Sequence, residues 1–512
     1  MDIFPLPAEP IHPPNKIYLT SLGDYDNGPF LEYPERQGWG PRSLTEWQMI
    51  FTNPPRAFVA FLERWLLTGF ISAVFESSIG TSEFINLENN ASDPQLTMEP
   101  FRRLFQGAFE DILDLDRSLD VNQSKNTQEA YKYGPMIHSR LMGHQEWVSY
   151  SELRKFSGTV SLIKFLNVVK VCDDPRSSQV AMVTSAVMES YNLLFSWTKF
   201  ESHEGGVHLG RGMSMDVRNS LLWTQLRADG WCPFELIPLF NAFNTPCLYF
   251  LRNLRRPSPH KSHQVIRIRS TQHSVNEDAS NTPSAQLCSA FKCGQLNDDS
   301  YCTNHTGGCY DCQEIRADSE ELCRILKDGK IPLILSLEEN DKNGTIILVE
   351  ADPSVSYVAI SHVWSDGLGN TKRNGLPRCQ LLRLSKMIRN LPGHHSDILH
   401  FWVDTICVPP NAARLEGAQL LALGLMPKTY EDATAVLVLD SWLLSSPCNG
   451  RSDIENIIRI FSSAWNSRLW TYQEGALAKV LYFQFEDTAY NLDEAARNMR
   501  KIEDAIQKVS VV

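Results

Sequence analysis

The sequence lacks a hydrophobic run long enough to cross a bilayer. Its longest apolar stretch, residues 57–75, is interrupted by Glu63 and Arg64, whereas a membrane-spanning helix needs about 20 consecutive, mainly apolar residues. The first ten residues have neither the basic region nor the apolar region of a secretory signal. We therefore expect no membrane span, and a protein that stays in the cytoplasm or the nucleus, where thiols remain reduced.

A surplus of positive charge is also missing. The 512 residues include 48 Lys and Arg against 60 Asp and Glu, a formal net charge of -12. Binding to nucleic acid depends on positive charge facing the phosphates, so no nucleic-acid partner is expected. The basic stretch 251–270 is interpreted as a solvated connector, with a phosphate contact as the alternative. No GxxxxGK[ST] motif occurs, so a P-loop nucleotide site is excluded.

Cysteine is present but unevenly distributed. Six of the twelve cysteines fall within 36 residues, at positions 288, 293, 302, 309, 312 and 323. In a reducing compartment such clustering favours a metal site over disulfides. The other six cysteines, including Cys379, are interpreted as small buried apolar residues.

The cluster has the residue types that zinc requires. Zinc takes four sulfur or nitrogen ligands at tetrahedral corners, and closely spaced pairs on tight turns can supply two corners each. A polar loop with unrelated thiols and a redox pair are the alternatives. We predict a structural zinc site with Cys288, Cys293, His305 and Cys312 as the first-choice ligands and with Cys309 and Cys302 as substitutes.

The first 250 residues are predicted to be mainly α-helical. After Pro54-Pro55, apolar side chains recur every three or four positions through Phe58, Phe61 and Trp65, the spacing of one helix face. Similar patterns occur at 100–116, 177–200 and 219–226. These aromatic stripes are expected to form core rather than a cofactor site. Residues 251–345 then form a basic linker followed by the Cys/His-rich segment.

The last third of the chain has a different pattern. Short β-rich segments alternate with helical ones, which predicts an α/β domain with a parallel sheet at 346–486, before a helical tail at 487–512. The whole is an α+β multidomain chain. The expected strands are 331–337, 345–350, 357–363, 401–408, 435–439 and 480–485, and the expected helices are 381–391, 414–430, 454–464 and 470–478.

Polar residues follow these expected strands, where ligands bind in parallel sheets. Asp404 lies inside an apolar strand, which is costly unless the carboxylate is paired or belongs to a site. Trp470 and Glu474 are four positions apart and share one helix face. An aromatic plane beside a carboxylate suits a flat or cationic ligand. The alternative is that Trp470 is core and Glu474 pairs with Arg468.

Three blocks carry a resemblance to a known family. Residues 357–364 (YVAISHVW), 402–409 (WVDTICVP) and 467–474 (SRLWTYQE) resemble, in order and spacing, the signature blocks of the fungal heterokaryon-incompatibility (HET) domain. They cover under a third of the chain. The first half and the Cys/His segment more loosely resemble the amino-terminal extension of some large HET proteins. Val408-Pro409-Pro410 departs from the Ile-Asn-Gln of some family members.

The resemblance implies a role in fungal non-self recognition and regulated cell death, a form of innate immunity. The HET domain is similar to the Toll/interleukin-receptor (TIR) domain, which implies a TIR-like or flavodoxin-like fold. In TIR domains that cleave NAD, a Glu four positions after a Trp is catalytic, a place taken here by Glu474. The same resemblance implies a ligand site formed by Ser361, His362, Trp364, Asp404, Arg468 and Trp470.

Two functions remain open at this stage. Cleavage of NAD passes through an oxocarbenium-like state, which a carboxylate can stabilise. Many TIR domains, however, only self-associate, and their helices have similar residues. The chain is therefore expected to act either as an NAD glycohydrolase or as a non-catalytic assembly module. Its partner would be a second copy or another incompatibility or signalling protein.

Overall fold

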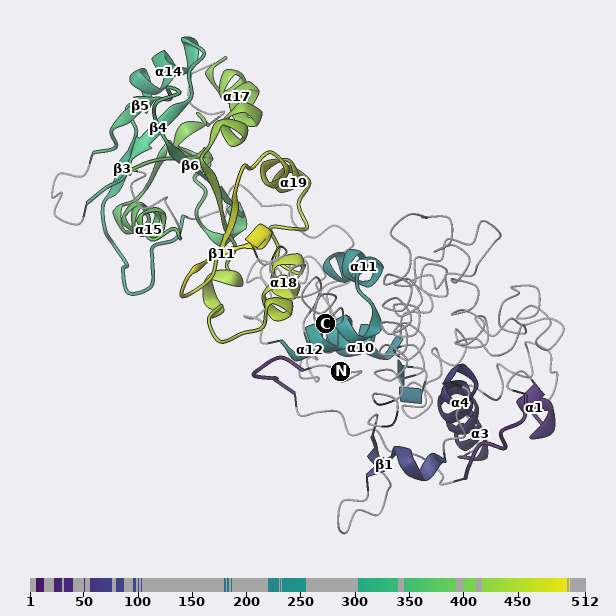
Figure 1. Ribbon diagram of the computed structural model, residues 1–512. Helices are drawn as coiled ribbons and strands as arrows, with labels where there is room; N and C mark the ends of the chain where they lie inside the picture. The colour runs from purple at the N-terminus through teal and green to yellow at the C-terminus, as the bar shows by residue number, and fades with distance from the viewer. Residues whose placement is uncertain are drawn as a thin grey trace, which may run out of the picture. The chain divides into compact units, whose positions relative to one another are not determined.

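A computed structural model describes the chain in two compact units, Met1–Phe291 with Asp504–Val512, and Lys292–Glu503 (Figure 1). Each unit is described by itself. The described residues are 6–12, 23–29, 32–39, 50, 56–75, 80–86, 95–97, 100, 103, 179–180, 182–183, 186, 220–229, 231, 233–254, 303–338, 345–392, 399–410, 417–494 and 497.

The first unit is helical where it is described, as predicted. A continuous helical stretch comprises α3 (Arg56–Leu62), the π-helix η2 (Glu63–Gly69) and α4 (Phe70–Phe75). Its aromatic stripe is core, because Phe58, Phe61 and Trp65 are fully buried. The other elements are α1 (Tyr33–Arg36), η3 (Thr81–Phe84), the pair β1 (Ile85–Asn86) and β2 (Gln95–Leu96), α10 (Ser220–Ala228), α11 (Pro233–Ala242) and α12 (Thr245–Asn253).

Some of the expected helices cannot be compared with the structure. The predicted helix at 100–116 and most of the one at 177–200 lie outside the described residues, as does most of the basic stretch 251–270. Within the described part of the chain, no helix is both long and apolar enough to cross a membrane.

The second unit is built on a mixed sheet of seven strands, in the order β11-β10-β9-β6-β8-β4-β5. The four central strands β10, β9, β6 and β8 are parallel, and β4, β5 and β11 are antiparallel to their neighbours. The strands are β4 (Pro332–Leu335), β5 (Leu348–Glu350), β6 (Tyr357–His362), β8 (His400–Val403), β9 (Ala435–Leu439), β10 (Leu481–Gln484) and β11 (Ala489–Asn491).

The expectation of a parallel sheet is therefore right for the core and wrong for the edges. β10 and β11 are separated by only four residues, and so short a connection can join only antiparallel neighbours. The expected strand at 401–408 is also shorter than predicted, because β8 ends at Val403. Asp404 then starts a single helical turn, α16 (Asp404–Cys407), and Asp disfavours strands because its side chain bonds to nearby backbone.

Helices cover both faces of this sheet (Figure 1). The chain crosses from β6 to β8 in one direction along the sheet and then from β8 back past β6 to β9 in the opposite direction. Because both crossovers are right-handed, α15 of the first and α17 of the second cover opposite faces. α17 packs against both α14 and α19. The helices are α14 (Ser319–Lys327), α15 (Arg378–Arg389), α17 (Ala418–Asp432), α18 (Asp453–Phe461) and α19 (Leu469–Ala476).

Local sequence explains where two of these helices begin. The Asp318 carboxylate accepts hydrogen bonds from the backbone N–H groups of Glu320 and Glu321 at the start of α14. Ser452 accepts one from Glu455 N–H at the start of α18, the Ser-x-x-Glu pattern of a capping box. Strands β6 and β9 are buried along their whole length, because helices cover them from both sides.

The strand order defines where a ligand can bind. In the sheet, β6 lies between β8 and β9. The chain passes from β6 to β8 on one side and then crosses back to β9 on the other side. The carboxyl ends of β6 and β9 therefore lie where the order of strands reverses, which is where open α/β sheets bind ligands. A second small sheet pairs β3 (Glu314–Arg316) with β7 (Gly375–Pro377), just before α15.

Candidate functional site

A polar network occupies the carboxyl ends of β6 and β8. His362 is the last residue of β6, and Asp404 directly follows β8. His362 Nε2 lies 2.7 Å from Asp404 Oδ1, and Trp364 Nε1 donates to Asp404 Oδ2 at 2.6 Å. The backbone N–H of Thr405 donates to Asp404 Oδ1, also at 2.6 Å. Three donors thus satisfy the partly buried Asp404 carboxylate, which offsets the cost of placing an acid at the end of an apolar strand.

A second group lies on the other face of β6, because successive residues of a strand point to opposite faces. Ser361 Oγ donates to Glu474 of α19, and Trp465 Nε1 donates to Ser361 Oγ at 2.6 Å. The Tyr430 hydroxyl, from α17, also forms a hydrogen bond with the Glu474 carboxyl group. The alternative, an ion pair between Glu474 and Arg468, does not occur among the described residues.

The charges of these groups are interdependent. Burial disfavours the charged imidazole, but the neighbouring Asp404 carboxylate outweighs it and raises the pKa of His362. Burial likewise opposes the charge of Asp404, yet His362 and the hydrogen bonds from Trp364 and Thr405 hold its pKa below the usual value. The two side chains therefore form a charged pair. Burial, aided by the charge of Asp404, raises the pKa of Glu474 although Ser361 opposes this rise.

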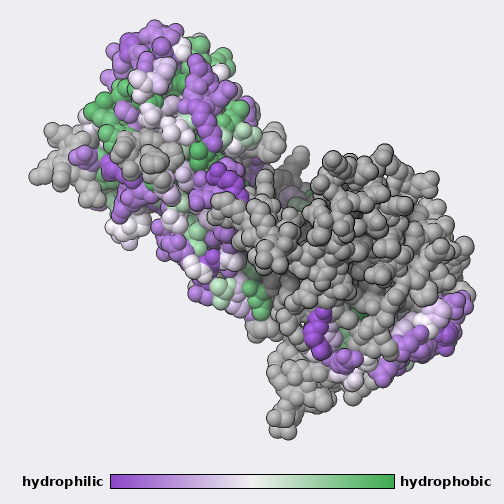
Figure 2. Space-filling model, in the orientation of Figure 1, coloured by the Kyte–Doolittle hydropathy of each residue, from purple (hydrophilic) through white to green (hydrophobic). Residues whose placement is uncertain are grey.

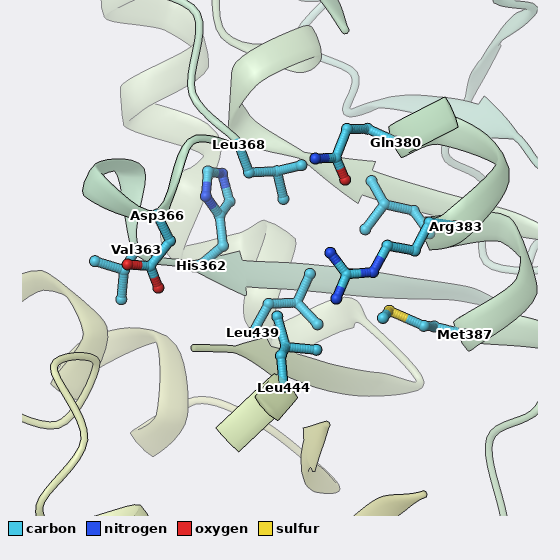
Figure 3. Close-up of a pocket in the computed structure, with 10 residues that line it drawn as sticks. His362, Val363, Asp366, Leu368, Gln380, Arg383, Met387, Leu439 and Leu444 are labelled. Carbon is cyan, nitrogen blue, oxygen red and sulfur yellow. The ribbon is translucent and has the colours of Figure 1, made fainter. Parts of the chain in front are cut away.

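A pocket opens on the α15 face of the sheet, where the strand order reverses (Figure 3). It is small, with a cavity volume of about 40 Å³, room for a few water molecules. Its polar lining consists of His362, Asp366, Gln380 and Arg383, and the other lining side chains are apolar. The Arg383 side chain extends from α15 into this space and forms no ion pair with another described residue. Glu474, on the α19 face, is not one of the lining residues.

Asp366 is the pocket residue with the most unusual environment. It follows β6 in the short 3₁₀ helix η7 (Trp364–Asp366). Its carboxylate accepts a hydrogen bond of 2.7 Å from the backbone N–H of Ser441, just after β9. Burial and the charge of Asp440 raise the pKa of Asp366 to about 6. An acid that titrates near neutral pH in a pocket is a candidate for proton transfer or ligand binding.

The structure brings most of the expected site residues together. His362, Trp364 and Asp404 form one hydrogen-bonded group, and Ser361 and Glu474 belong to the second, on the other face of β6. Arg468 occupies the N-cap position of α19, and its side chain takes part in no ion pair with a described residue. The side chain of Trp470 lies outside the described side chains, so its stacking role stays a prediction.

Sequence analysis missed Tyr430 and Trp465 as members of the site. Tyr430 looks like an ordinary apolar position at the end of a helix, and its hydroxyl meets Glu474 only because α17 and α19 pack together. Trp465 lies in a loop before α19, where sequence alone does not show that its N–H reaches Ser361. Arg383 was also missed, since the pocket that it lines depends on the packing of α15 against β6.

A separate Cys/His cluster lies in the same unit. The ligand atoms of His305, Cys309, Cys312 and Cys379 all lie within 4.8 Å of one another. His305 Nδ1 is 3.6 Å from Cys309 Sγ, 3.3 Å from Cys312 Sγ and 3.6 Å from Cys379 Sγ. In a tetrahedral zinc site with ordinary bond lengths, nitrogen and sulfur ligands are about 3.6 Å apart. The cluster can therefore bind a metal such as zinc.

The cluster agrees with only part of the expected ligand set. His305, Cys309 and Cys312 are members, whereas the expected ligands Cys288 and Cys293 and the substitute Cys302 lie outside the described residues. The fourth member, Cys379, is not the isolated buried residue that sequence analysis assumed. It is the second residue of α15 and comes 67 positions after Cys312. The three thiols, of Cys309, Cys312 and Cys379, form no disulfide.

Comparison of the chain with models of known protein families, with curated proteins and with solved structures finds no match. The function is therefore inferred from the chemistry of the site and from the resemblance of the three sequence blocks.

Proposed function

We propose that this chain is a HET-type protein of fungal non-self recognition and regulated cell death, and that its α/β domain cleaves NAD. One observation carries the proposal: three blocks far apart in sequence meet at the carboxyl end of β6, where Ser361 bonds to Glu474 on one face and His362 pairs with Asp404 on the other. The strand order β8-β6-β9-β10 supports a TIR-like domain, because it follows the 2-1-3-4 order of flavodoxin-like folds.

In the proposed reaction, Glu474 stabilises the positive charge that develops on the ribose. The bond between C1′ and the nicotinamide nitrogen breaks, and its electron pair leaves with the nicotinamide. Water then adds to C1′ and loses a proton. Ser361 and Tyr430 hold the carboxylate in place. Because the pKa of Glu474 is raised by burial, activity should increase as pH rises through that pKa.

Side chains near the strand ends supply groups that suit the rest of NAD. The Arg383 guanidinium is available for a phosphate, since an arginine can donate two parallel hydrogen bonds to such a group. Trp364 offers an indole face beside the strand ends, and its N–H is already fixed by Asp404. Under this proposal the His362–Asp404 pair holds the ligand-binding end of β6 to that of β8.

The proposal can be tested in cells that express the protein. We expect wild type to lower cellular NAD and growth, and Glu474→Gln to abolish both effects at equal protein levels. Glu486→Gln is the matched control, because Glu486 is an exposed acid beyond β10 and should behave like wild type. Equal NAD loss with Glu474→Gln would exclude this residue as the catalytic group.

A second candidate function is non-catalytic assembly, and one observation favours it. α17 exposes three leucines, Leu420 by 72%, Leu421 by 44% and Leu423 by 45%. Figure 2 shows hydrophobic colour at the part of the α/β unit where Figure 1 places α17. Such a surface suits self-association. Sedimentation should show association that Leu420→Glu weakens, and a wild type that stays monomeric at every concentration would exclude this function.

We also propose that the Cys/His cluster holds one structural zinc ion. Four protein ligands close a tetrahedral site and leave no position for substrate. Elemental analysis should find one zinc per chain, and a clean preparation without stoichiometric metal would refute this. The proposed setting is the cytoplasm or nucleus, with a second copy or another incompatibility protein as partner.

A further inference from the structure

The segment that carries the metal ligands also touches the pocket. Asp366–Gly369, here called the pocket loop, follows β6 and contributes Asp366 and Leu368 to the pocket lining. Thr303 and Asn304, directly before His305, bind this loop. The backbone N–H of Asn304 donates to Gly367 O at 2.8 Å, and Thr303 Oγ1 donates to Gly369 O at 2.6 Å.

The same segment is held from its other side by α15. Gln380 Nε2 donates to Asn304 O at 2.9 Å, and Gln380 directly follows the cluster member Cys379. The Thr306 N–H points to Cys379 Sγ at 3.3 Å. Residues 303–306 are thus inserted between the pocket loop and the first turn of α15, and the four-residue cluster closes this arrangement.

The pocket loop is also connected to the strand-end network. Thr405 Oγ1 donates to Leu368 O at 2.9 Å, and the same residue's N–H binds Asp404. The position of the loop therefore affects both the pocket lining and the surroundings of Asp404. Gly367 adopts φ +91°, a left-handed conformation that glycine adopts without the steric cost of a side chain.

Further hydrogen bonds hold the metal-binding segment, among them Cys309 N–H to Thr306 O and Arg378 N–H to Gln313 O. Residues 303–313 form no helix or strand, and fixing a backbone residue costs about 1–2 kcal/mol. A typical hydrogen bond contributes only about 0.5–1.5 kcal/mol net. The bonds from Thr303 and Asn304 therefore cannot order eleven residues by themselves. A structural metal ion can, because its binding free energy becomes folding free energy.

We propose that the metal held by His305, Cys309, Cys312 and Cys379 fixes the pocket loop, so that the pocket forms fully only in the metal-loaded protein. The inference rests on the proposed zinc site and does not depend on NAD cleavage. The metal joins a segment without regular structure to α15, and Thr303 and Asn304 transmit that constraint to the loop. Metal availability then controls whether the site can bind its ligand.

Hydrogen exchange measured by mass spectrometry tests this on the full-length, metal-loaded protein. Removing the metal by chelation, or by Cys379→Ser, should speed exchange in the pocket loop at least tenfold. Peptides covering β10 should change less than twofold. Returning zinc to the chelated wild type should restore protection. Cys323→Ala is the matched control, because this thiol of α14 lies outside the cluster; it should keep both metal and protection.

A variant that spares every ligand separates the loop contact from metal binding. In Gly367→Ala the new Cβ would lie 2.0 Å from Asn304 Nδ2, so the loop must move away from the metal-binding segment. We expect this variant to retain one metal per chain while its pocket loop exchanges faster. A loop as protected as in wild type would show that the contact with Asn304 does not fix it.

The possible failures are distinguishable. Wild type without stoichiometric metal would refute the zinc site itself. Metal loss that leaves exchange in the pocket loop unchanged would refute the inference while the zinc site stands. Equal acceleration in β6, β8, β9 and β10 would also refute it, because the metal would then support the whole unit rather than the loop.

Discussion

The charged pair between His362 and Asp404 should make stability depend on pH in a defined way. The perturbation is Asp404→Asn, which keeps the shape of the side chain but removes its charge. Burial of the imidazole is then opposed only by the weaker effects of Glu474 and Asp366, so the pKa of His362 should fall in the folded variant. The variant loses the ion pair with His362 and part of the hydrogen bonding that Trp364 and Thr405 supply to Asp404.

The expected magnitude follows from the exposure of the two side chains. Breaking a fully buried ion pair costs about 3–5 kcal/mol, and an exposed pair contributes less than about 1 kcal/mol. The His362 side chain is 2% exposed and that of Asp404 is 24% exposed. We therefore expect Asp404→Asn to lower the free energy of unfolding by about 2–3 kcal/mol at pH 6.

The pH dependence follows from the directions of the two pKa shifts. The pKa of His362 is raised above 6.5, so its contribution is full below that pH and disappears as pH rises through the folded pKa. The pKa of Asp404 is lowered below 3.8, so its contribution is full above that pH and disappears as pH falls through the folded pKa. The destabilisation should therefore be largest between about pH 4 and pH 6.5 and smaller at pH 9.

The assay is hydrogen exchange of peptides covering β6 and β8 in increasing urea, at pH 6 and pH 9 with exchange times corrected for pH. These buried strands report the unfolding of their own unit. His362→Gln and the double variant complete a thermodynamic cycle that isolates the coupling between the two side chains. A destabilisation by Asp404→Asn that is the same at both pH values would refute the charged pair.

Two further predictions concern neighbouring side chains. Asp366→Asn should stabilise the protein at pH 8 by up to about 3 kcal/mol. The reason is that burial raises the pKa of Asp366 from 3.8 to about 6, so ionising this group costs stability as pH rises through that range. In thermal unfolding the gain in stability should vanish at pH 4. Trp465→Phe should cost about 1 kcal/mol in urea unfolding, because it removes the hydrogen bond to Ser361 but keeps a ring against Phe483.

Much of the α/β unit could be predicted because short buried strands and amphipathic helices have strong local patterns. The expected strands at 357–363 and 435–439 agree with β6 (Tyr357–His362) and β9 (Ala435–Leu439). The strand expected at 401–408 was too long, because its apolar residues continue past Asp404 into a helical turn. The antiparallel edges were missed, since strand direction depends on pairing rather than on local pattern.

The site was predictable to the extent that its residues lie in the sequence blocks themselves. Ser361, Asp404 and Glu474 each lie in one of the three blocks. Cys379 was missed because it is far in sequence from the other cysteines, and only the pairing of β3 with β7 brings it to them. Tyr430 was missed for the same kind of reason, since helix packing alone places its hydroxyl beside Glu474.

The most direct test of the proposed function is nicotinamide release from NAD by purified, metal-loaded protein at high concentration. Wild type should release nicotinamide, and Glu474→Gln should reduce the rate on the order of 10²-fold while exchange in β6 and the zinc content stay unchanged. Equal rates for the two proteins, or no release by a wild type whose pocket loop is protected and whose zinc is bound, would contradict catalysis by Glu474.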